Sequence, residues 1–345
     1  MRRVMTAFMA VFLLSLPNAV LADGFAEKLR AGTFVLHTEN DKFGGGTDEF
    51  YTNGVQATWV SPVLESWEDA DVHASIEMLA GSLPLINDER KHSISFGIGH
   101  TIFTPVDTQT TEPQPDDRPY AGWLYGTLGL HAKNSKRLDV FELTLGIVGP
   151  SALGEQVQND YHRLIGVDEA NGWEHQLHDE PGLMLTWERN WRLFPDKDPA
   201  RTGGWGFDAT PHFGATVGNV KTYVNAGGEV RFGYNLPADF GTSFIGPADG
   251  VNAPIDGLED SRPGFHVFGG LEGKAVARDI FLDGNTWRDS PSVAKRPFVG
   301  DAYFGLSVRP SNHFAVTYTQ VVRSKEFYGQ THPHVFGSLS LSFNF

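Results

Sequence analysis

The last twelve residues, "HVFGSLSLSFNF", constrain the fold most, because apolar and small polar side chains alternate along them. One face carries Leu339, Leu341, Phe343 and Phe345, and the other carries Ser338, Ser340, Ser342 and Asn344. A period of two residues is typical of a β-strand whose faces meet different surroundings. Such an apolar face packs in the core of a soluble protein or against lipid in a transmembrane barrel, so one strand leaves both folds open.

Segments of the same kind recur along the chain. Phe141, Leu143 and Leu145 alternate with Glu142 and Thr144, for example, which gives that segment a polar face as well. The sequence predicts twelve strands, near residues 33–40, 51–62, 92–104, 120–133, 137–149, 182–193, 205–217, 221–234, 264–277, 298–309, 313–323 and 334–345. An even number of strands is usual for single-chain bacterial barrels.

The first 22 residues, "MRRVMTAFMAVFLLSLPNAVLA", have the features of a secretory signal peptide. Arg2 and Arg3 precede an apolar run, and Val20-Leu21-Ala22 supplies the small residues at a cleavage site. No later stretch reaches the ~18 consecutive apolar residues that a spanning helix needs. We therefore expect an exported protein whose mature part, residues 23–345, is one domain without a membrane-spanning helix.

Cysteine content and charge exclude several classes of function. The chain has no Cys, so thiol catalysis, disulfides and Cys-ligated metals are excluded. Its net charge is −15, and removing Arg2 and Arg3 with the signal peptide makes it −17 (−15 − 2), which argues against nucleic acid as a partner. The excess of carboxylates is instead compatible with binding divalent cations.

These features together predict an all-β fold, a transmembrane antiparallel up-and-down β-barrel of about 12 strands in the bacterial outer membrane. By strand parity, residues 63–91 and 235–263 would form long connections on the periplasmic side, where barrel turns are normally short. A secreted soluble β-sandwich is the alternative fold.

One segment interrupts the strand pattern. In "SALGEQVQNDYHRLIG", residues 151–166, the apolar residues Val157, Tyr161, Leu164 and Ile165 recur at i, i+4, i+7 and i+8. This spacing predicts a short helix in the extracellular loop after the fifth strand.

Strand parity also gathers three polar clusters at the extracellular rim. The first is the hairpin "TENDKFGGGTDEFYTNG", where Asn40 and Asp41 end one strand and Tyr51, Thr52 and Asn53 begin the next. Its oxygen atoms could bind a cation, although Asn, Asp and Gly are also ordinary turn residues.

The second cluster is "DDRPYAGW", residues 116–123, in which Arg118 could pair with an acidic group or a phosphate and Tyr120 and Trp123 could lie at the membrane interface. A plain junction between a loop and a strand explains this segment equally well. The third is Gln158 with His162, four residues apart and therefore on one helix face. A histidine there could act as a base while the glutamine orients a water.

The blocks "TENDKFGGGTDEFYTNGV", "DDRPYAGW" and "GPSALGEQVQNDYHRLIG" together resemble the outer-membrane lipid A 3′-O-deacylase family. The resemblance implies a twelve-stranded barrel with a calcium-dependent site on its extracellular rim. That site would hydrolyse the ester that attaches the 3′-acyloxyacyl group of lipid A. The implied partners are lipopolysaccharide and the outer-membrane bilayer, and we expect a monomer.

The family's active-site positions correspond to Asn40, Asp41, Thr52, Gln158 and His162, with Asp168 where the family can have a glutamate. We predict that His162, Gln158, Thr52 and Asn40 are catalytic and that Asp41, Asn40 and Asp168 bind Ca²⁺. Two departures concern the head-group contacts. The loop 106–117 lacks the lysines of some relatives, and Ala170 stands where a tyrosine can occur.

Without a cysteine or a serine elbow, the nucleophile that this chemistry needs is water, and His162 is the expected base. Two other functions remain open for such a barrel. A phospholipase would use the same histidine, water and calcium chemistry on glycerophospholipid esters. A passive porin or transporter would conduct solutes through a polar lumen, and the rim residues would only shape loops.

Overall fold

The computed structural model describes residues 31–43, 49–70, 74–83, 85–86, 90–194, 203–246 and 262–345. The predicted signal peptide, the glycines at 44–46 and parts of both long connections lie outside these ranges. In the described parts, no helix is both long enough and apolar enough to cross a membrane.

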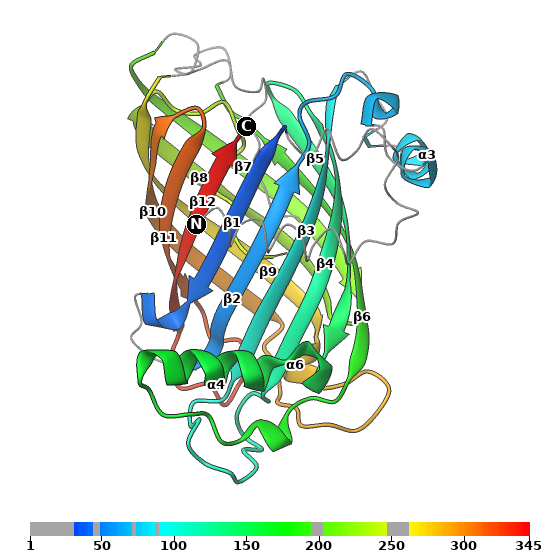
Figure 1. The fold of residues 1–345 in the computed structure, drawn as a ribbon, viewed down its shortest axis with the longest axis vertical. Coiled ribbons are helices and arrows are strands. Elements are labelled where there is room, and N and C mark those ends of the chain that lie inside the picture. The colour runs from blue at the N-terminus through cyan, green and yellow to red at the C-terminus, as the bar shows by residue number, and fades with distance from the viewer. Residues whose placement is uncertain are drawn as a thin grey trace.

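Twelve antiparallel strands form a closed barrel in which each strand pairs with its neighbours in sequence, and β1 pairs with β12 (Figure 1). The strands are β1 (Thr33–Asn40), β2 (Phe50–Val60), β3 (Lys91–Thr104), β4 (Ala121–Lys133), β5 (Arg137–Val148), β6 (Glu180–Trp191), β7 (Trp205–Gly218), β8 (Lys221–Tyr234), β9 (Gly264–Asp279), β10 (Phe298–Ser311), β11 (Phe314–Arg323) and β12 (His334–Asn344). The predicted all-β barrel and its strand number are confirmed, with boundaries shifted by a few residues.

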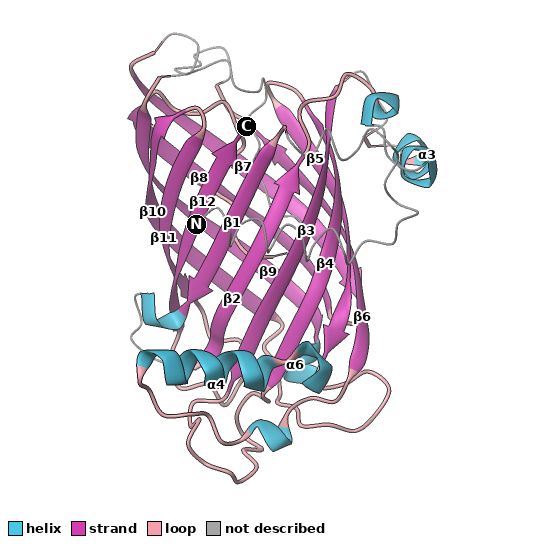
Figure 2. Cartoon of the chain, in the orientation of Figure 1, coloured by secondary structure: helices cyan, strands magenta, loops and turns pink. Residues whose placement is uncertain are grey.

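Helices are few and lie in the connections (Figure 2). Among the described residues they are the 3₁₀ turns η1 (Asp41–Phe43), η2 (Trp67–Ala70), η3 (Pro150–Ala152) and η4 (Trp173–His175), and the α-helices α3 (Ala74–Ser82), α4 (Gly154–Ile165) and α6 (Ile280–Asp283). α4 is the helix that the sequence predicts after the fifth strand.

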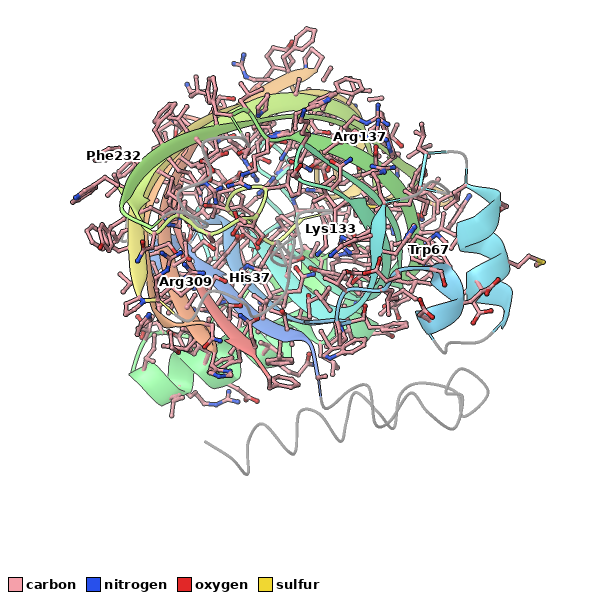
Figure 3. All side chains as sticks on the ribbon, turned by 90° about the horizontal axis from the view of Figure 1, so that it is seen from above. His37, Trp67, Lys133, Arg137, Phe232 and Arg309 are labelled. Atoms are coloured by element: carbon pink, nitrogen blue, oxygen red, sulfur yellow. The ribbon has the colours of Figure 1, made fainter. Side chains whose placement is uncertain are left out.

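The two faces of the barrel wall differ as the alternation requires. Seen along the barrel in Figure 3, His37 and Lys133 lie inside, and Phe232 points away from the wall. Glu142 and Thr144 are likewise buried, whereas Leu145 is 49% exposed. Large apolar side chains cover the outside of the later strands, among them Phe207, Val217, Val230, Val267, Phe304 and Leu306. Such an outer surface suits lipid rather than water.

The connections separate into two sets. One end of the barrel, here the Phe345 end, is where Gly32 and Phe345 exchange backbone hydrogen bonds of 2.9 and 3.0 Å. The opposite end, the α4 end, carries the loops after β1, β3 and β5, so the three polar clusters do share one rim (Figure 1). Both long connections leave from the Phe345 end, as strand parity predicts.

The β2–β3 connection packs on the outside of the wall, where η2 and α3 stand beside the strands (Figure 3). The indole of Trp67 stacks on the imidazole of His92 with ring centroids 4.2 Å apart. Ala80 and Ile86 join the same apolar cluster with Ile94 of the outer wall. The apolar residues of this connection therefore explain its length, because they cover a patch of the wall.

The β8–β9 connection takes the opposite course and enters the lumen. The backbone N–H of Thr242 donates to Glu229 Oε1 at 3.1 Å, and that of Ile245 donates to Glu39 Oε1 at 3.0 Å. The Phe244 ring packs edge-to-face on Tyr303, with centroids 4.9 Å apart. Residues 239–246 thus fill part of the lumen with protein, which an open channel does not do.

Candidate functional site

The first group of predicted site residues lies at the α4 end of β1 and β2. Asn40 Nδ2 donates to the Thr52 carbonyl at 3.0 Å, and Asn40 Oδ1 accepts from the Lys42 N–H at 2.9 Å. The fully buried Asp41 accepts from the Glu49 N–H through Oδ2 at 2.6 Å. These bonds fold η1 back against the start of β2 and hold Asn40, Asp41 and Thr52 together.

These side chains belong to the outer face of the barrel wall. Glu39, Tyr51 and Phe103 line the lumen, and the alternation of a strand turns Asn40 and Thr104 the other way. A β-bulge between Tyr51 and Asn53 leaves Thr52 out of the β2–β3 ladder. The Thr52 hydroxyl then lies 2.7 Å from the Thr104 hydroxyl, and both side chains are buried.

Backbone strain accompanies this hairpin. Phe50, the first residue of β2, has a φ of 65° although it has a bulky side chain, and it is completely buried. Its ring packs against Phe327, His332 and His334 of the β11–β12 connection and β12. Strained backbone of this kind persists only where the surroundings fix it, and it is frequent at functional sites.

The second group lies on α4 and the segment after it. His162 Nδ1 is 2.7 Å from the Asp168 carbonyl oxygen. A carbonyl only accepts, so Nδ1 carries the hydrogen of this bond, and in the neutral ring Nε2 carries the lone pair. His162 is thereby held in the tautomer that a general base needs. The Asp168 carboxylate, predicted as a metal ligand, is exposed at this position.

Gln158 is oriented by Trp173, a residue that was not predicted from the sequence to belong to the site. Trp173 Nε1 donates to Gln158 Oε1 at 2.9 Å, and both side chains are buried. Asn159 adds two hydrogen bonds with the backbone of Ala170, accepting from its N–H at 2.8 Å and donating to its carbonyl at 3.2 Å. Gln158 and His162 therefore lie on one buried, polar face of α4.

Packing on β3 and β4 brings this polar face to the outer wall near the first group. His100 Nε2 is 2.7 Å from the Ala152 carbonyl, and Ile102 packs in one cluster with Tyr120 and Trp173. A side chain on Gly122 would come within 3.1 Å of the Gly154 backbone, so the absence of one allows α4 to lie close. Ile102 and Thr104 share a strand face about 7 Å apart, which joins the two groups through β3.

Arg118 of the second predicted cluster has a structural partner. It is almost fully buried, lies 3.4 Å from Glu326 Oε2, and stacks over Phe103 at 5.3 Å from the ring centroid. Burial raises the pKa of the Glu326 carboxyl, but Arg118 and Arg323 together bring that pKa below its usual value. The expectation that Tyr120 and Trp123 lie at the membrane interface is wrong, because both rings are buried.

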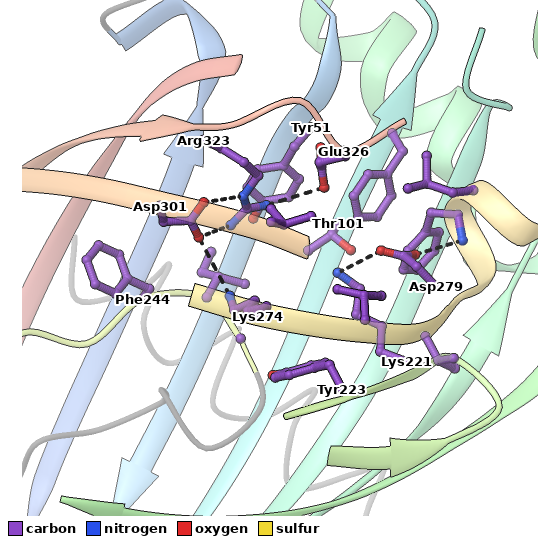
Figure 4. A pocket seen from close by; sticks show the side chains of 18 of the residues that line it. Tyr51, Thr101, Lys221, Tyr223, Phe244, Lys274, Asp279, Asp301, Arg323 and Glu326 are labelled. Atoms are coloured by element: carbon purple, nitrogen blue, oxygen red, sulfur yellow. Dashed lines mark hydrogen bonds and ion pairs between the residues drawn. The ribbon is translucent and has the colours of Figure 1, made fainter. Parts of the chain in front are cut away.

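A separate cavity lies in the lumen (Figure 4). Its wall carries charges of both signs, as Arg323 and Lys274 bind Asp301 at 2.8 and 3.6 Å and Lys221 lies 3.6 Å from Asp279. Asn40, Asp41, Thr52, Gln158 and His162 are not among the residues that line it. The lumen and the predicted site therefore occupy opposite faces of the wall.

The residues of the first group suit a hard cation in chemistry. Asp41 offers a buried carboxylate, and Asn40, Thr52 and Thr104 carry neutral oxygens, which are the donor types that Ca²⁺ prefers. Within the ranges that the structure describes, no cluster of three or more His, Cys, Asp or Glu side chains could hold a metal. Within the first group itself, Asp41 is the carboxylate that a cation could use, and the other ligands would be neutral oxygens.

A family model described as outer membrane protein LpxR matches residues 7–345, nearly the whole chain. The chain belongs to the LpxR family. This is the lipid A 3′-O-deacylase family that the three sequence blocks resemble, and membership supports an integral outer-membrane location and a lipid A deacylase activity. A search of curated protein sequences gave no match.

Solved structures agree with this family. LpxR from Salmonella typhimurium has a TM-score of 0.71 and 17% sequence identity, over 91% of this chain and 100% of that chain. At this identity the likeness shows the fold. The β domain of the Bordetella autotransporter Brka reaches a TM-score of 0.41, with 7% identity over 91% and 99% of the two chains. The translocator domain of autotransporter NalP from Neisseria meningitidis reaches 0.35, with 8% identity over 93% and 92%. The TM-scores of the two autotransporter domains are too low to support any conclusion about this chain.

Proposed function

We propose that this LpxR-family barrel hydrolyses the ester that attaches the 3′-acyloxyacyl group of lipid A, with a water activated by His162. The observation that carries the proposal is the bond between His162 Nδ1 and the Asp168 carbonyl, because it leaves Nε2 as the proton-accepting nitrogen. Gln158, four residues away on the same buried face, is placed to orient the water.

The reaction balances with this one base. Nε2 of His162 takes a proton from water as the oxygen bonds to the ester carbonyl carbon, which forms a tetrahedral oxyanion. Collapse of this intermediate breaks the bond between the carbonyl carbon and the 3′ oxygen. His162 returns its proton to that oxygen, giving a free acyloxyacyl acid and a 3′ hydroxyl on lipid A.

The first group supplies hydrogen bonds and oxygen ligands. One of the Thr52 and Thr104 hydroxyls donates to the other, and the accepting hydroxyl would donate its own hydrogen to the substrate. Ca²⁺ would be held by Asp41 and Asn40, with Asp168 as a further ligand, and would polarise the ester carbonyl and stabilise the oxyanion. Asn40 keeps this group in place through its bond to the Thr52 carbonyl.

The proposal includes the setting of the site. The α4 end faces the cell exterior, where lipid A forms the outer leaflet, and residues 1–22 are removed on export. We also propose a monomer, which the closed barrel supports because each of the described strands has a partner on both sides.

Two other functions give different outcomes. A phospholipase of the same mechanism would release fatty acids from glycerophospholipids and leave lipid A unchanged. The porin alternative is disfavoured by residues 239–246, which bind Glu229 and Glu39 inside the lumen.

The test is His162→Ala, together with His162→Asn, whose amide can still donate to the Asp168 carbonyl but cannot act as a base. Both variants should keep the heat-modifiable migration of a folded barrel and lose about 10²- to 10⁴-fold of lipid A deacylation, measured by mass spectrometry. His313→Ala is the matched control, because His313 Nδ1 bonds to a carbonyl at the Phe345 end at 3.0 Å. Full activity in His162→Asn would remove His162 as the base.

A further inference from the structure

The apolar residues of α4 face away from the barrel wall, whereas a helix packed on a protein core turns its apolar residues toward that core. The side that meets the barrel wall is small or polar and consists of Gly154, Gln158, Asn159 and His162. The apolar residues Leu153, Val157, Tyr161, Leu164 and Ile165 are all more than 40% exposed. In a water-soluble protein this distribution would leave a large apolar stripe in water.

The stripe is continuous along the helix. Leu153, Val157, Tyr161 and Ile165 follow one another at intervals of four residues, and Leu164 lies beside them, 82% exposed. At about 100° per residue, these positions fall on one side of the helix. Beyond the C-terminus of α4, Val167 is 41% exposed, and Phe43 of η1, on the same rim, is also 41% exposed.

Three exposed polar residues of α4, Gln156, Asp160 and Arg163, lie on a third side of the helix. Gln156 and Arg163 are the two farthest from the stripe, and Asp160 adjoins Leu164 at its edge. Arg163 pairs with Asp160 on the helix and with Glu169 beyond it, at 2.9 Å for the latter. The hydrogen bond from Arg163 to Glu169 and the negative charge of Glu169 raise the pKa of the Arg163 guanidinium. The polar flank of the helix is therefore suited to contact with water, and the apolar stripe is not.

The position of α4 explains what meets the apolar flank. Figure 1 shows the helix crossing the outside of the wall at the ends of β1 to β4, with its axis across the strands. The outer wall on this half of the barrel continues the apolar surface, as Leu145 and Leu183 are 49% and 45% exposed. Because barrel strands cross a membrane, a helix lying across them lies along the membrane surface.

We propose that α4 is an interfacial helix whose stripe, Leu153, Val157, Tyr161, Leu164 and Ile165, is inserted among the acyl chains of the outer leaflet. Its polar flank faces the aqueous phase, and its buried face carries Gln158 and His162 against the wall. The helix then holds these two side chains at the depth where acyl chains begin. The insertion of the helix does not depend on the proposed function. The approach of the substrate does rest on it, because the ester of lipid A would then reach His162 by moving laterally within the membrane.

The first test uses the absence of cysteine in the chain, which makes single-cysteine variants unambiguous. Leu164→Cys and Val157→Cys place a nitroxide spin label on the stripe, and Arg163→Cys and Gln156→Cys place it on the polar flank. The refolded full-length barrel is measured in vesicles of phosphatidylethanolamine and phosphatidylglycerol. Labels at 164 and 157 should collide more with oxygen and less with a water-soluble nickel chelate, and labels at 163 and 156 should show the reverse. High nickel accessibility at all four positions would overturn the proposal.

A second test links the stripe to turnover. Val157→Glu with Leu164→Glu should lower deacylation of lipid A in vesicles at least tenfold and leave the rate on detergent-dispersed lipid A within about twofold. Gln156→Glu, which adds one negative charge on the polar flank, should leave both rates unchanged. Equal losses in vesicles and detergent would contradict a membrane role for the stripe. Failure of the proposed function is distinguishable, because then the wild-type protein would not deacylate lipid A while the spin-label result stands by itself.

Discussion

Trp173 offers the sharpest test of how the site is built, because it acts on Gln158 and has no chemistry of its own in the proposed reaction. Its Nε1 donates to Gln158 Oε1 at 2.9 Å, and the two side chains are 1% and 3% exposed. Trp173→Phe removes this donor and keeps an aromatic ring between Tyr120 and Gly154. The change therefore affects the orientation of Gln158 more than the packing of the loop.

The magnitude follows from burial. Losing the partner of a buried polar atom costs about 1–3 kcal/mol, and a smaller ring in a packed cluster adds to that cost. Without the bond from Trp173, Gln158 is no longer held in one orientation. If the free energy of that bond is lost from the transition state, each loss of about 1.4 kcal/mol corresponds to a tenfold fall in rate. We expect kcat for lipid A deacylation to fall about 10- to 100-fold with KM nearly unchanged, since the substrate still binds.

The assay is deacylation of detergent-dispersed lipid A at several concentrations, followed by mass spectrometry, with barrel folding checked by heat-modifiable migration. Trp187→Phe is the matched control, because its Nε1 also donates to a side chain, Asp139, at 3.2 Å but lies near the Phe345 end of β6. A Trp173→Phe variant with wild-type kcat, or one that loses activity only as much as Trp187→Phe does, would refute the positioning role.

Two further predictions concern the metal and the lumen. Asp41→Asn retains an oxygen for the Glu49 N–H but removes the carboxylate charge, so the barrel should fold and deacylation should stay low even in millimolar Ca²⁺. In the wild-type protein, a calcium chelator should abolish deacylation until Ca²⁺ is added back. Deacylation by Asp41→Asn in the presence of the chelator would contradict the metal role. Because residues 239–246 fill part of the lumen, wild-type protein in planar bilayers should show little conductance, and Phe244→Gly with Ile245→Gly should raise it; a large, steady wild-type conductance would restore the porin interpretation.

The strands were predictable from sequence because the alternation of apolar and polar residues is visible within each single strand. Leu339 to Phe345 alternate with serines whether or not the neighbouring strand is known, and the same holds for Phe141 to Leu145. Parity then places the loops after β1, β3 and β5 on one rim without any tertiary information. That is why Asn40, Gln158 and His162 could be assigned to the same end.

Features that depend on contacts between distant segments were not predictable in this way. Thr104 is one more threonine at the end of a strand, and only a bulge at Thr52 brings the two hydroxyls together. Trp173 follows α4 in an irregular segment, where nothing local indicates a bond to Gln158. The rings of Tyr120 and Trp123 were misplaced because an aromatic residue near a strand end is as suited to a packed cluster as to the membrane interface.

The long connections illustrate the same limit. Their lengths followed from the sequence, but one packs outside the wall through Trp67 and the other enters the lumen through Phe244 and Ile245. Both contain apolar residues, and which side of the wall they cover depends on where complementary partners such as Glu39 and Ile94 face. Those partners are known only once the register is fixed.

The outward orientation of Asn40, Thr52 and Thr104 has a kinetic consequence. A site on the outer wall meets its substrate by diffusion in two dimensions, so turnover should follow the number of lipid A molecules per unit area of membrane and not their total concentration in the sample. Diluting lipid A with inert phospholipid should slow the reaction at constant total lipid A. Adding more vesicles of the same composition should leave the rate per enzyme unchanged.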